Sequence, residues 1–201
     1  MSSDAQVIDT NKLGEIAKFE VFDTTGEKVK FGSLFEDQKT VVIFIRHFFC
    51  GSCMQYVSAL AKVRPEALND VGVKIVLIGC GKWNLIQNYK AETGFANDVY
   101  ANPDRTLYNA LNMTYNLNLT PAGQRKASYV QLGMITNVVR SLKWAILKNP
   151  TNLTKGGPAA QNGGDFVLGP GQICHFAHIM QHTEDHVEVA TLMEKAGVPY
   201  P

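Results

Sequence analysis

The chain has 201 residues, of which 45% are hydrophobic, and its formal net charge at pH 7 is +1. This size favours one domain with an insertion over two domains. The balanced charge, with no basic run longer than two residues, argues against nucleic-acid binding. The N-terminus does not resemble a signal peptide, and no apolar stretch approaches the roughly 18 residues of a membrane span. We therefore expect a cytoplasmic protein with neither nucleic acid nor membrane as a partner.

The chain begins with a polar segment and a predicted β-hairpin. Residues 1–15 are expected to be loosely ordered, and a single domain is expected over residues 16–201. Apolar residues flank the glycine-containing stretch 23–27, which predicts a turn between two short strands.

The apolar run Val41–Ile45 predicts a buried strand, because it is short, continuous and rich in β-branched residues. It leads into Cys50-Gly51-Ser52-Cys53, and the pattern after Met54 becomes helical, with Pro65 expected to kink or end the helix. The two cysteines therefore lie at a helix N-terminus, where free N–H groups and the helix dipole stabilise a thiolate. We interpret the pair as a redox dithiol. The alternative, a zinc half-site, lacks a second C-x-x-C or C-x-H pair.

Arg46 and His47 precede the dithiol and are candidate supporting residues. A cation beside a thiolate lowers the pKa of the thiol. Because successive strand residues point to opposite faces, we expect one of the two to face the cysteines. The alternative for each is a charge at the strand end that points into solvent.

Strands and helices alternate in the next part of the chain. Strands are predicted at 73–80 and 99–100, and helices at 83–93, closed by Gly94, and at 104–111, capped by Asp104. This alternation indicates an α/β sheet with parallel strand pairs and helices on its faces. Active sites in such sheets lie beyond the carboxyl ends of strands, and Cys50 follows the end of its strand.

Residues 112–163 interrupt the alternation and form a predicted insertion. Apolar residues at three- and four-residue steps predict an amphipathic helix. Its apolar stripe consists of Leu132, Ile135, Val139, Leu142 and Ile146. The stripe has three interpretations: it packs on its own domain, it covers the active site, or it forms a subunit contact within a homodimer.

The C-terminal part is predicted as a hairpin around Gly169–Gly171 and a last helix capped by Thr183. Four of the five histidines, His175, His178, His182 and His186, fall within twelve residues, and His182 and His186 have the spacing of a metal-binding pair. His175 and His178 are expected to point to opposite sides of a strand. A hydrogen-bonded structural cluster is favoured, because Thr183 as the cap leaves His182 outside the helix. No metal site is expected.

Several other polar residues receive structural interpretations. Asp98, Asp104 and Asp165 are interpreted as turn or cap residues instead of catalytic acids. Cys80 and Cys174 are interpreted as small core residues, because free cysteine packs like a small hydrophobe.

Ordered motifs give the chain a family resemblance. The segments 44–53, 78–81 and 100–103 resemble the peroxiredoxin-like AhpC/TSA antioxidant family, and within it a branch common in fungi. The segments 161–166, 169–171 and 176–186 strengthen this resemblance, which covers about residues 16–197. It implies a thioredoxin-like fold, with a central mixed sheet flanked by helices and a helical insertion before the C-terminal hairpin. It also implies thiol peroxidase or reductase activity.

The dithiol can be aligned in two registers. Typical peroxiredoxins carry P-x-x-x-T-x-x-C, and in that register Arg46 replaces the proline, Cys50 replaces the threonine and Cys53 is the peroxidatic cysteine. In the thioredoxin register Cys50 is the nucleophile and Cys53 resolves. Typical thioredoxins also place a proline before the strand that faces the dithiol, and Gly163-Gly164 stands there instead.

These features predict a thiol-dependent oxidoreductase with Cys50 and Cys53 as catalytic residues. The expected partners are a peroxide, disulfide or small-molecule substrate and an external thiol reductant such as thioredoxin or glutathione; no cofactor is required. The candidate pocket residues are Phe49, Gly163, Gly164 and His178. Two alternatives stay open: a scaffold reused as an enzyme for an organic metabolite, and a non-catalytic binding or regulatory module.

Overall fold

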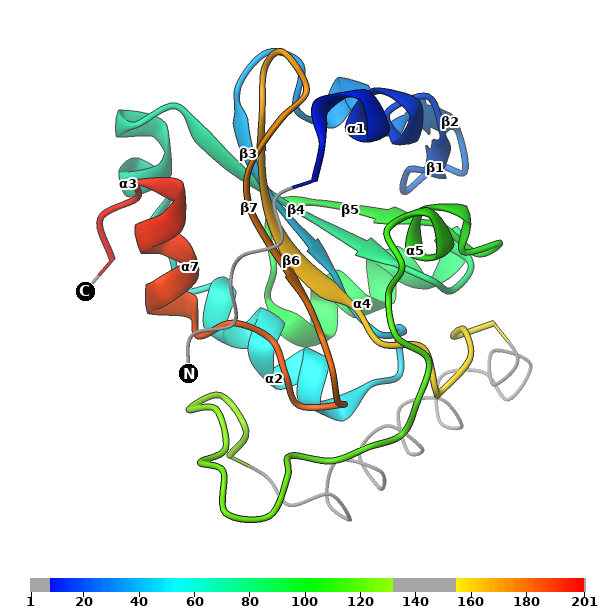
Figure 1. The fold of residues 1–201 in the computed structure, drawn as a ribbon, viewed down its shortest axis with the longest axis vertical. Coiled ribbons are helices and arrows are strands. Elements are labelled where there is room, and N and C mark those ends of the chain that lie inside the picture. The colour runs from blue at the N-terminus through cyan, green and yellow to red at the C-terminus, as the bar shows by residue number, and fades with distance from the viewer. Residues whose placement is uncertain (1–7, 132–154, 201) are drawn as a thin grey trace.

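A computed structural model of the protein describes residues 8–131 and 155–200 (Figure 1). The fold is α/β, with a seven-stranded mixed sheet in the order β2-β1-β5-β4-β3-β6-β7. The strands are β1 Glu20–Phe22, β2 Lys28–Lys30, β3 Lys39–Phe44, β4 Val73–Gly79, β5 Asp98–Ala101, β6 Gly164–Gly169 and β7 Ile173–Ile179. The α-helices are α1 Thr10–Ile16, α2 Gly51–Leu60, α3 Pro65–Asp70, α4 Ile86–Thr93, α5 Thr106–Ala110 and α7 Val189–Ala196. Short 3-10 turns cover Phe31–Leu34 and Trp83–Leu85.

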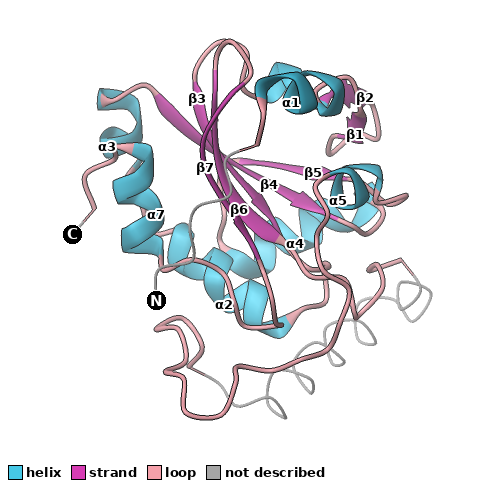
Figure 2. Ribbon diagram, viewed as in Figure 1, coloured by secondary structure: helices cyan, strands magenta, loops and turns pink. Residues whose placement is uncertain are grey.

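Helices cover both faces of the sheet (Figure 2). The central strand β3 shows this most directly, because Val41 and Ile43 pack with α2, α4 and α7, whereas Val42 and Phe44 pack with α1 and α5. A strand that is buried on both faces needs a continuous apolar run, which the sequence supplies. Strands β3, β4 and β5 are parallel and are joined by helical crossovers, and β3 pairs with β6 in antiparallel orientation.

Most of the predicted elements are confirmed. The first hairpin is β1 and β2, the last is β6 and β7, and the dithiol lies between β3 and α2. Gly94 ends α4 and Gly197 ends α7 with φ angles of 71° and 80°, in the left-handed region that glycine adopts easily.

Two expectations in the N-terminal half differ from the structure. Helix α2 ends at Leu60, and Pro65 begins α3, where its missing N–H costs no hydrogen bond. Residues 10–15, which were expected to be loosely ordered, form most of α1; Asp9 caps this helix and Leu13 is fully buried.

Two expected helix caps are wrong. Asn102, not Asp104, serves the start of α5, because Asn102 Oδ1 accepts a hydrogen bond from Leu107 N at 3.0 Å. Thr183 does not cap the last helix, since α7 begins later, at Val189. Residues 182–188 therefore form a loop, and this loop lies beside the dithiol.

The predicted apolar stripe of the insertion, from Leu132 to Ile146, lies outside the described residues. Its three interpretations therefore stay predictions. The described part of the insertion touches the dithiol region directly: Phe48 N donates to Gly156 O at 3.2 Å, and Lys82 N donates to Lys155 O at 2.8 Å.

Candidate active site

The two cysteines occupy the first turn of α2, just beyond the carboxyl end of β3. Cys50 is the N-cap residue, and its Sγ accepts a hydrogen bond from Cys53 N at 3.4 Å. Cys50 is 4% exposed and Cys53 is fully buried. Neither cysteine forms a disulfide in this structure. The N-cap position directs helix N–H groups toward the Cys50 sulfur, which favours its ionised form.

Arg46 supplies a cation to Cys50. Its Nη1 donates to Cys50 Sγ at 3.3 Å, its Nε donates to Asn162 Oδ1 at 3.0 Å, and its Nη2 donates to Ala159 O. Arg46 is 6% exposed, and no carboxylate among the described residues forms an ion pair with it. A buried guanidinium stays protonated and needs a counter-charge, so the Cys50 thiolate is the group that can neutralise it.

The backbone of Arg46 is also held by hydrogen bonds to the sulfurs of Cys53 and Cys80. Arg46 N donates to Cys53 Sγ at 3.4 Å, and Cys80 Sγ donates to Arg46 O at 2.9 Å. Burial raises the pKa of Cys80 to about 12, so Cys80 stays a thiol donor near neutral pH. The predicted role of Cys80 as a buried core residue thus agrees with its position.

The two cysteines of the dithiol differ in protonation. Burial by itself would raise the pKa of Cys50, but hydrogen bonding from Cys53 and the charge of Arg46 outweigh it and hold that pKa well below its ordinary value. Burial, together with hydrogen bonding and repulsion from Cys50, keeps the pKa of Cys53 well above its ordinary value. The surroundings therefore favour ionisation of Cys50 and oppose ionisation of Cys53.

His47 does not supply the cation. Burial lowers the pKa of His47 to about 4; the neighbouring Cys50 opposes this shift and Arg46 adds to it. The ring is therefore neutral near pH 7. Its Nδ1 is buried and has no hydrogen-bond partner among the described residues. Of the two residues that the sequence offered, Arg46 is the one that contacts the cysteine sulfur.

Cys53 faces a buried histidine, and this histidine contacts a buried aspartate. Cys53 Sγ lies 3.7 Å from His186 Nε2, and His186 Nδ1 lies 2.8 Å from Asp165 Oδ1. Asp165 is fully buried on β6, and its Oδ2 accepts a second hydrogen bond from Val187 N at 2.9 Å. The His186 ring stacks on the ring of Tyr56, with centroids 4.3 Å apart and planes 2° apart.

Sequence reasoning missed Asp165 and His186 as members of this site. Asp165 was interpreted as a turn residue, but it lies within a strand that is buried along its whole length. A carboxylate in an apolar strand requires a buried partner, and this signal was available in the sequence. His186 was placed in a structural histidine cluster, and its contact with α2 depends on the path of the loop 182–188.

The four candidate pocket residues each make a packing or polar contact of their own, and Gly164 pairs with Phe44 of β3. Phe49 packs against Gly156, and His178 pairs with Asp185, Nε2 to Oδ2 at 3.4 Å. Gly163 lies so close to the Phe44 carbonyl group that a Cβ atom would clash with it. The glycine at this position therefore reflects close packing of two backbones.

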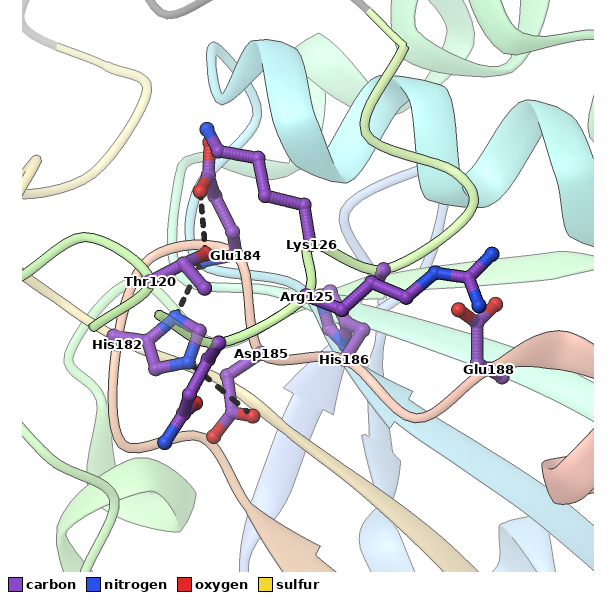
Figure 3. Close-up of a pocket in the computed structure, with 10 residues that line it drawn as sticks. Thr120, Arg125, Lys126, His182, Glu184, Asp185, His186 and Glu188 are labelled. Carbon is purple, nitrogen blue, oxygen red and sulfur yellow. Dashed lines mark hydrogen bonds and ion pairs between the residues drawn. The ribbon is translucent and has the colours of Figure 1, made fainter. Parts of the chain in front are cut away.

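A cavity of about 370 Å³ lies beside His186 (Figure 3). One wall comes from the segment that includes Thr120 and Lys126, and the other comes from the loop that includes Glu184 and His186. The two walls are tied together, because Thr120 Oγ1 donates to Glu184 Oε2 at 2.7 Å and Lys126 Nζ lies 3.0 Å from Glu184 Oε1. Within the described ranges, no three potential metal ligands cluster, and no helix is long and apolar enough to cross a membrane.

Comparisons with known proteins show the family to which the chain belongs. The model of a family described as AhpC/TSA antioxidant enzyme matches residues 59–182. Peroxiredoxin-like 2C of Mus musculus is 32% identical over 183 residues, which cover 91% of this chain and 79% of the relative. The chain belongs to the AhpC/TSA antioxidant enzyme family. The family match begins after the dithiol, so the roles of Cys50 and Cys53 are argued from their geometry.

The chain is also similar to a second named relative in sequence and to a solved peroxiredoxin structure in fold. A prostamide/prostaglandin F synthase of Aquarana catesbeiana is 25% identical over 194 residues, which cover 95% of this chain and 89% of the relative. The solved structure of a peroxiredoxin Q from Xanthomonas campestris superposes with a TM-score of 0.59 at 13% identity, covering 97% and 96% of the two chains. This structural likeness shows that the fold is the thioredoxin-like fold of peroxiredoxins, as the sequence motifs implied.

Proposed function

We propose that this family member is a thiol-dependent oxidoreductase in which Cys50 is the nucleophile and Cys53 resolves. The observation that carries the proposal is the contact of 3.3 Å between Arg46 Nη1 and Cys50 Sγ at the N-cap of α2. A buried cation and a helix N-terminus both stabilise the thiolate, which is the reactive form of cysteine. Cys53 has neither contact with the guanidinium nor exposure to solvent.

The proposed reaction has three steps. The Cys50 thiolate attacks a peroxide oxygen, an S–O bond forms, the O–O bond breaks, and the departing oxygen takes a proton and leaves as water or alcohol. The Cys53 sulfur then attacks the Cys50 sulfenic acid, which forms the disulfide and releases water. Two electrons from an external thiol reductant restore both cysteines. A reducing compartment such as the cytoplasm would supply that reductant.

The burial of Cys50 supports small substrates. With 4% of its surface exposed, Cys50 admits a hydroperoxide or a small thiol more easily than a folded protein disulfide. We therefore place peroxides ahead of protein disulfides as substrates. Glutathione-sized thiols fit the same access better than a large reductant does.

The similarity to a prostamide/prostaglandin F synthase favours a second candidate, in which the same thiolate acts on a larger organic metabolite. The two candidates differ in the dependence of rate on substrate size. Hydrogen peroxide and cumene hydroperoxide, each tested with the wild-type protein and dithiothreitol, distinguish them. A strong preference for the bulky hydroperoxide would support the second candidate.

Peroxide consumption by single cysteine variants tests the proposal. We expect wild type and Cys174→Ser, the matched control on β7, to turn over peroxide with dithiothreitol as the reductant. Cys50→Ser should lose turnover, and Cys53→Ser should accumulate a Cys50 sulfenic acid that dimedone traps. Equal turnover by Cys50→Ser and wild type would refute the proposal, and no turnover by wild type would favour a non-catalytic module.

A further inference from the structure

The imidazole of His186 is held in one orientation by three contacts besides Cys53. Its Nδ1 faces Asp165, its ring stacks on Tyr56, and its backbone N–H donates to the Tyr129 hydroxyl at 2.9 Å. The side chain is 1% exposed, and that of Asp165 is fully buried. An imidazole fixed in this way cannot turn to exchange its two nitrogens, so the tautomer decides what it offers to Cys53.

The hydrogen bonds of Asp165 define that tautomer. A carboxylate only accepts hydrogen bonds, and Asp165 already accepts one from Val187 N at 2.9 Å. The bond of 2.8 Å to its other oxygen therefore needs a proton on His186 Nδ1. Neutral His186 then has an unprotonated Nε2, and this nitrogen lies 3.7 Å from Cys53 Sγ. The Cys53 thiol can donate to it.

The Cys53 proton has two acceptors in the reduced protein, the Cys50 thiolate and His186 Nε2. Once a peroxide has converted Cys50 into a sulfenic acid, its negative charge is gone. His186 Nε2 is then the basic atom beside Cys53. The base thus becomes the dominant acceptor at the step in which Cys53 must act as a nucleophile.

We infer that His186 is the proton acceptor for the resolving cysteine, and that Asp165 is the positioning residue that holds its tautomer. This inference rests on the proposed function. As Cys53 Sγ attacks Cys50 Sγ, the Cys53 proton passes to Nε2, the S–S bond forms and the S–O bond breaks. The departing hydroxide takes a proton from the solvent and leaves as water, so His186 stays protonated. When an external thiol later attacks Cys50 in the disulfide, protonated His186 returns a proton to the departing Cys53 sulfur.

The rate of disulfide closure after one equivalent of hydrogen peroxide tests this role. Positioned general bases contribute about 100-fold or more, so His186→Gln should close the disulfide about 100-fold more slowly near pH 7. The defect should shrink as the pH rises, because hydroxide then ionises Cys53 without help. Asp165→Asn should show the same pattern in weaker form. His175→Gln, the matched control at an exposed position of β7, should close at the wild-type rate.

The titratable groups around His186 that affect this pH profile come from four elements. They are Cys53 and Tyr56 on α2, Asp165 on β6, Arg125, Lys126 and Tyr129 in the insertion, and His182, Glu184, Asp185 and Glu188 in the loop 182–188 (Figure 3). The rate of disulfide closure is therefore compared between wild type and variants at each pH. The comparison isolates the contribution of the imidazole.

Trapping the Cys50 sulfenic acid with dimedone separates a failure of the proposed function from a failure of the role of His186. If wild-type Cys50 forms no sulfenic acid, the proposed function fails. If Cys50 is oxidised normally and His186→Gln closes the disulfide as fast as wild type, only the role of His186 is overturned. Nitrogen-15 NMR of wild type gives a second test that needs no variant: a proton on Nε2 of neutral His186, in place of Nδ1, would also overturn it.

Discussion

The surroundings of Cys50 and Cys53 differ sharply, although one helical turn separates the two residues. Cys50 lies at the N-cap of α2 and accepts hydrogen bonds from Arg46 and Cys53 N. Cys53 lies inside the core and faces His186. The first environment stabilises an anion, and the second keeps a thiol protonated beside a base. The two sulfurs of one C-x-x-C segment can therefore have opposite protonation preferences, because one lies at the helix N-cap beside a cation and the other lies inside the core.

Removal of the cation should have the largest effect on this contrast. Arg46→Met keeps a chain of similar length without its charge, so the pKa of Cys50 should rise and its thiolate fraction should fall. We expect Cys50 to react with iodoacetamide about 100-fold more slowly near pH 7, which corresponds to about two pKa units. Arg64→Met, at an exposed position, is the control. An unchanged rate in Arg46→Met would show that the helix N-terminus alone ionises Cys50.

The pair of His178 and Asp185 fastens the loop that presents His186. Burial would lower the pKa of His178, but hydrogen bonding to Asp185 and the charge of Asp165 raise it to about 9 from 6.5. Because the pKa is higher in the folded state, this stabilisation is complete below about pH 6.5 and is lost as the pH rises through 9. We expect the loss to be on the order of 3 kcal/mol in the free energy of unfolding.

Denaturant unfolding of wild type and His178→Gln across this pH range measures that loss. The stability difference between the two proteins should narrow as the pH rises, whereas His175→Gln should follow wild type throughout. If the curves of wild type and His178→Gln run parallel, the ion pair does not hold the loop.

Removal of the Ser52 hydroxyl should have the smallest effect on Cys50. Ser52 Oγ lies 3.1 Å from Cys50 Sγ and 3.0 Å from Thr183 O, so its one hydrogen is divided between two acceptors. We expect Ser52→Ala to change the alkylation rate of Cys50 by no more than about threefold and to cost about 1 kcal/mol of stability. A loss of about tenfold or more would mean that the hydroxyl donates to the thiolate instead.

The sequence was sufficient to predict the N-cap half of this contrast. The apolar run before Cys50 and the helical pattern after Met54 are local signals, and they place the dithiol where the structure has it. Arg46 is a candidate supporting residue on a local signal too, because it directly follows the predicted strand and precedes the dithiol. The choice between Arg46 and His47 required the structure, because it depends on burial and on the partner Asn162, which is distant in sequence.

The other half could not be predicted in the same way. Asp165 and His186 meet Cys53 only after β6 is paired with β3 and the following loop is folded back over α2. The expected cap at Thr183 would have placed His186 on a helix, and the structure places it in a loop instead. The capping preference of Thr183 gave way here to tertiary contacts, whereas at α5 one local residue, Asn102, took the place of another, Asp104.

The central claim is that Cys50 ionises far more easily than Cys53. The most direct test is to alkylate both cysteines of wild type across a range of pH and to measure the two rates by mass spectrometry. We predict that Cys50 reacts with iodoacetamide at a rate that is constant from about pH 7 to 9, because its thiol is already ionised. Cys53 should stay unmodified over that range, because burial and Cys50 raise its pKa. Alkylation of Cys53 before Cys50, or of both with the same pH dependence, would contradict the account.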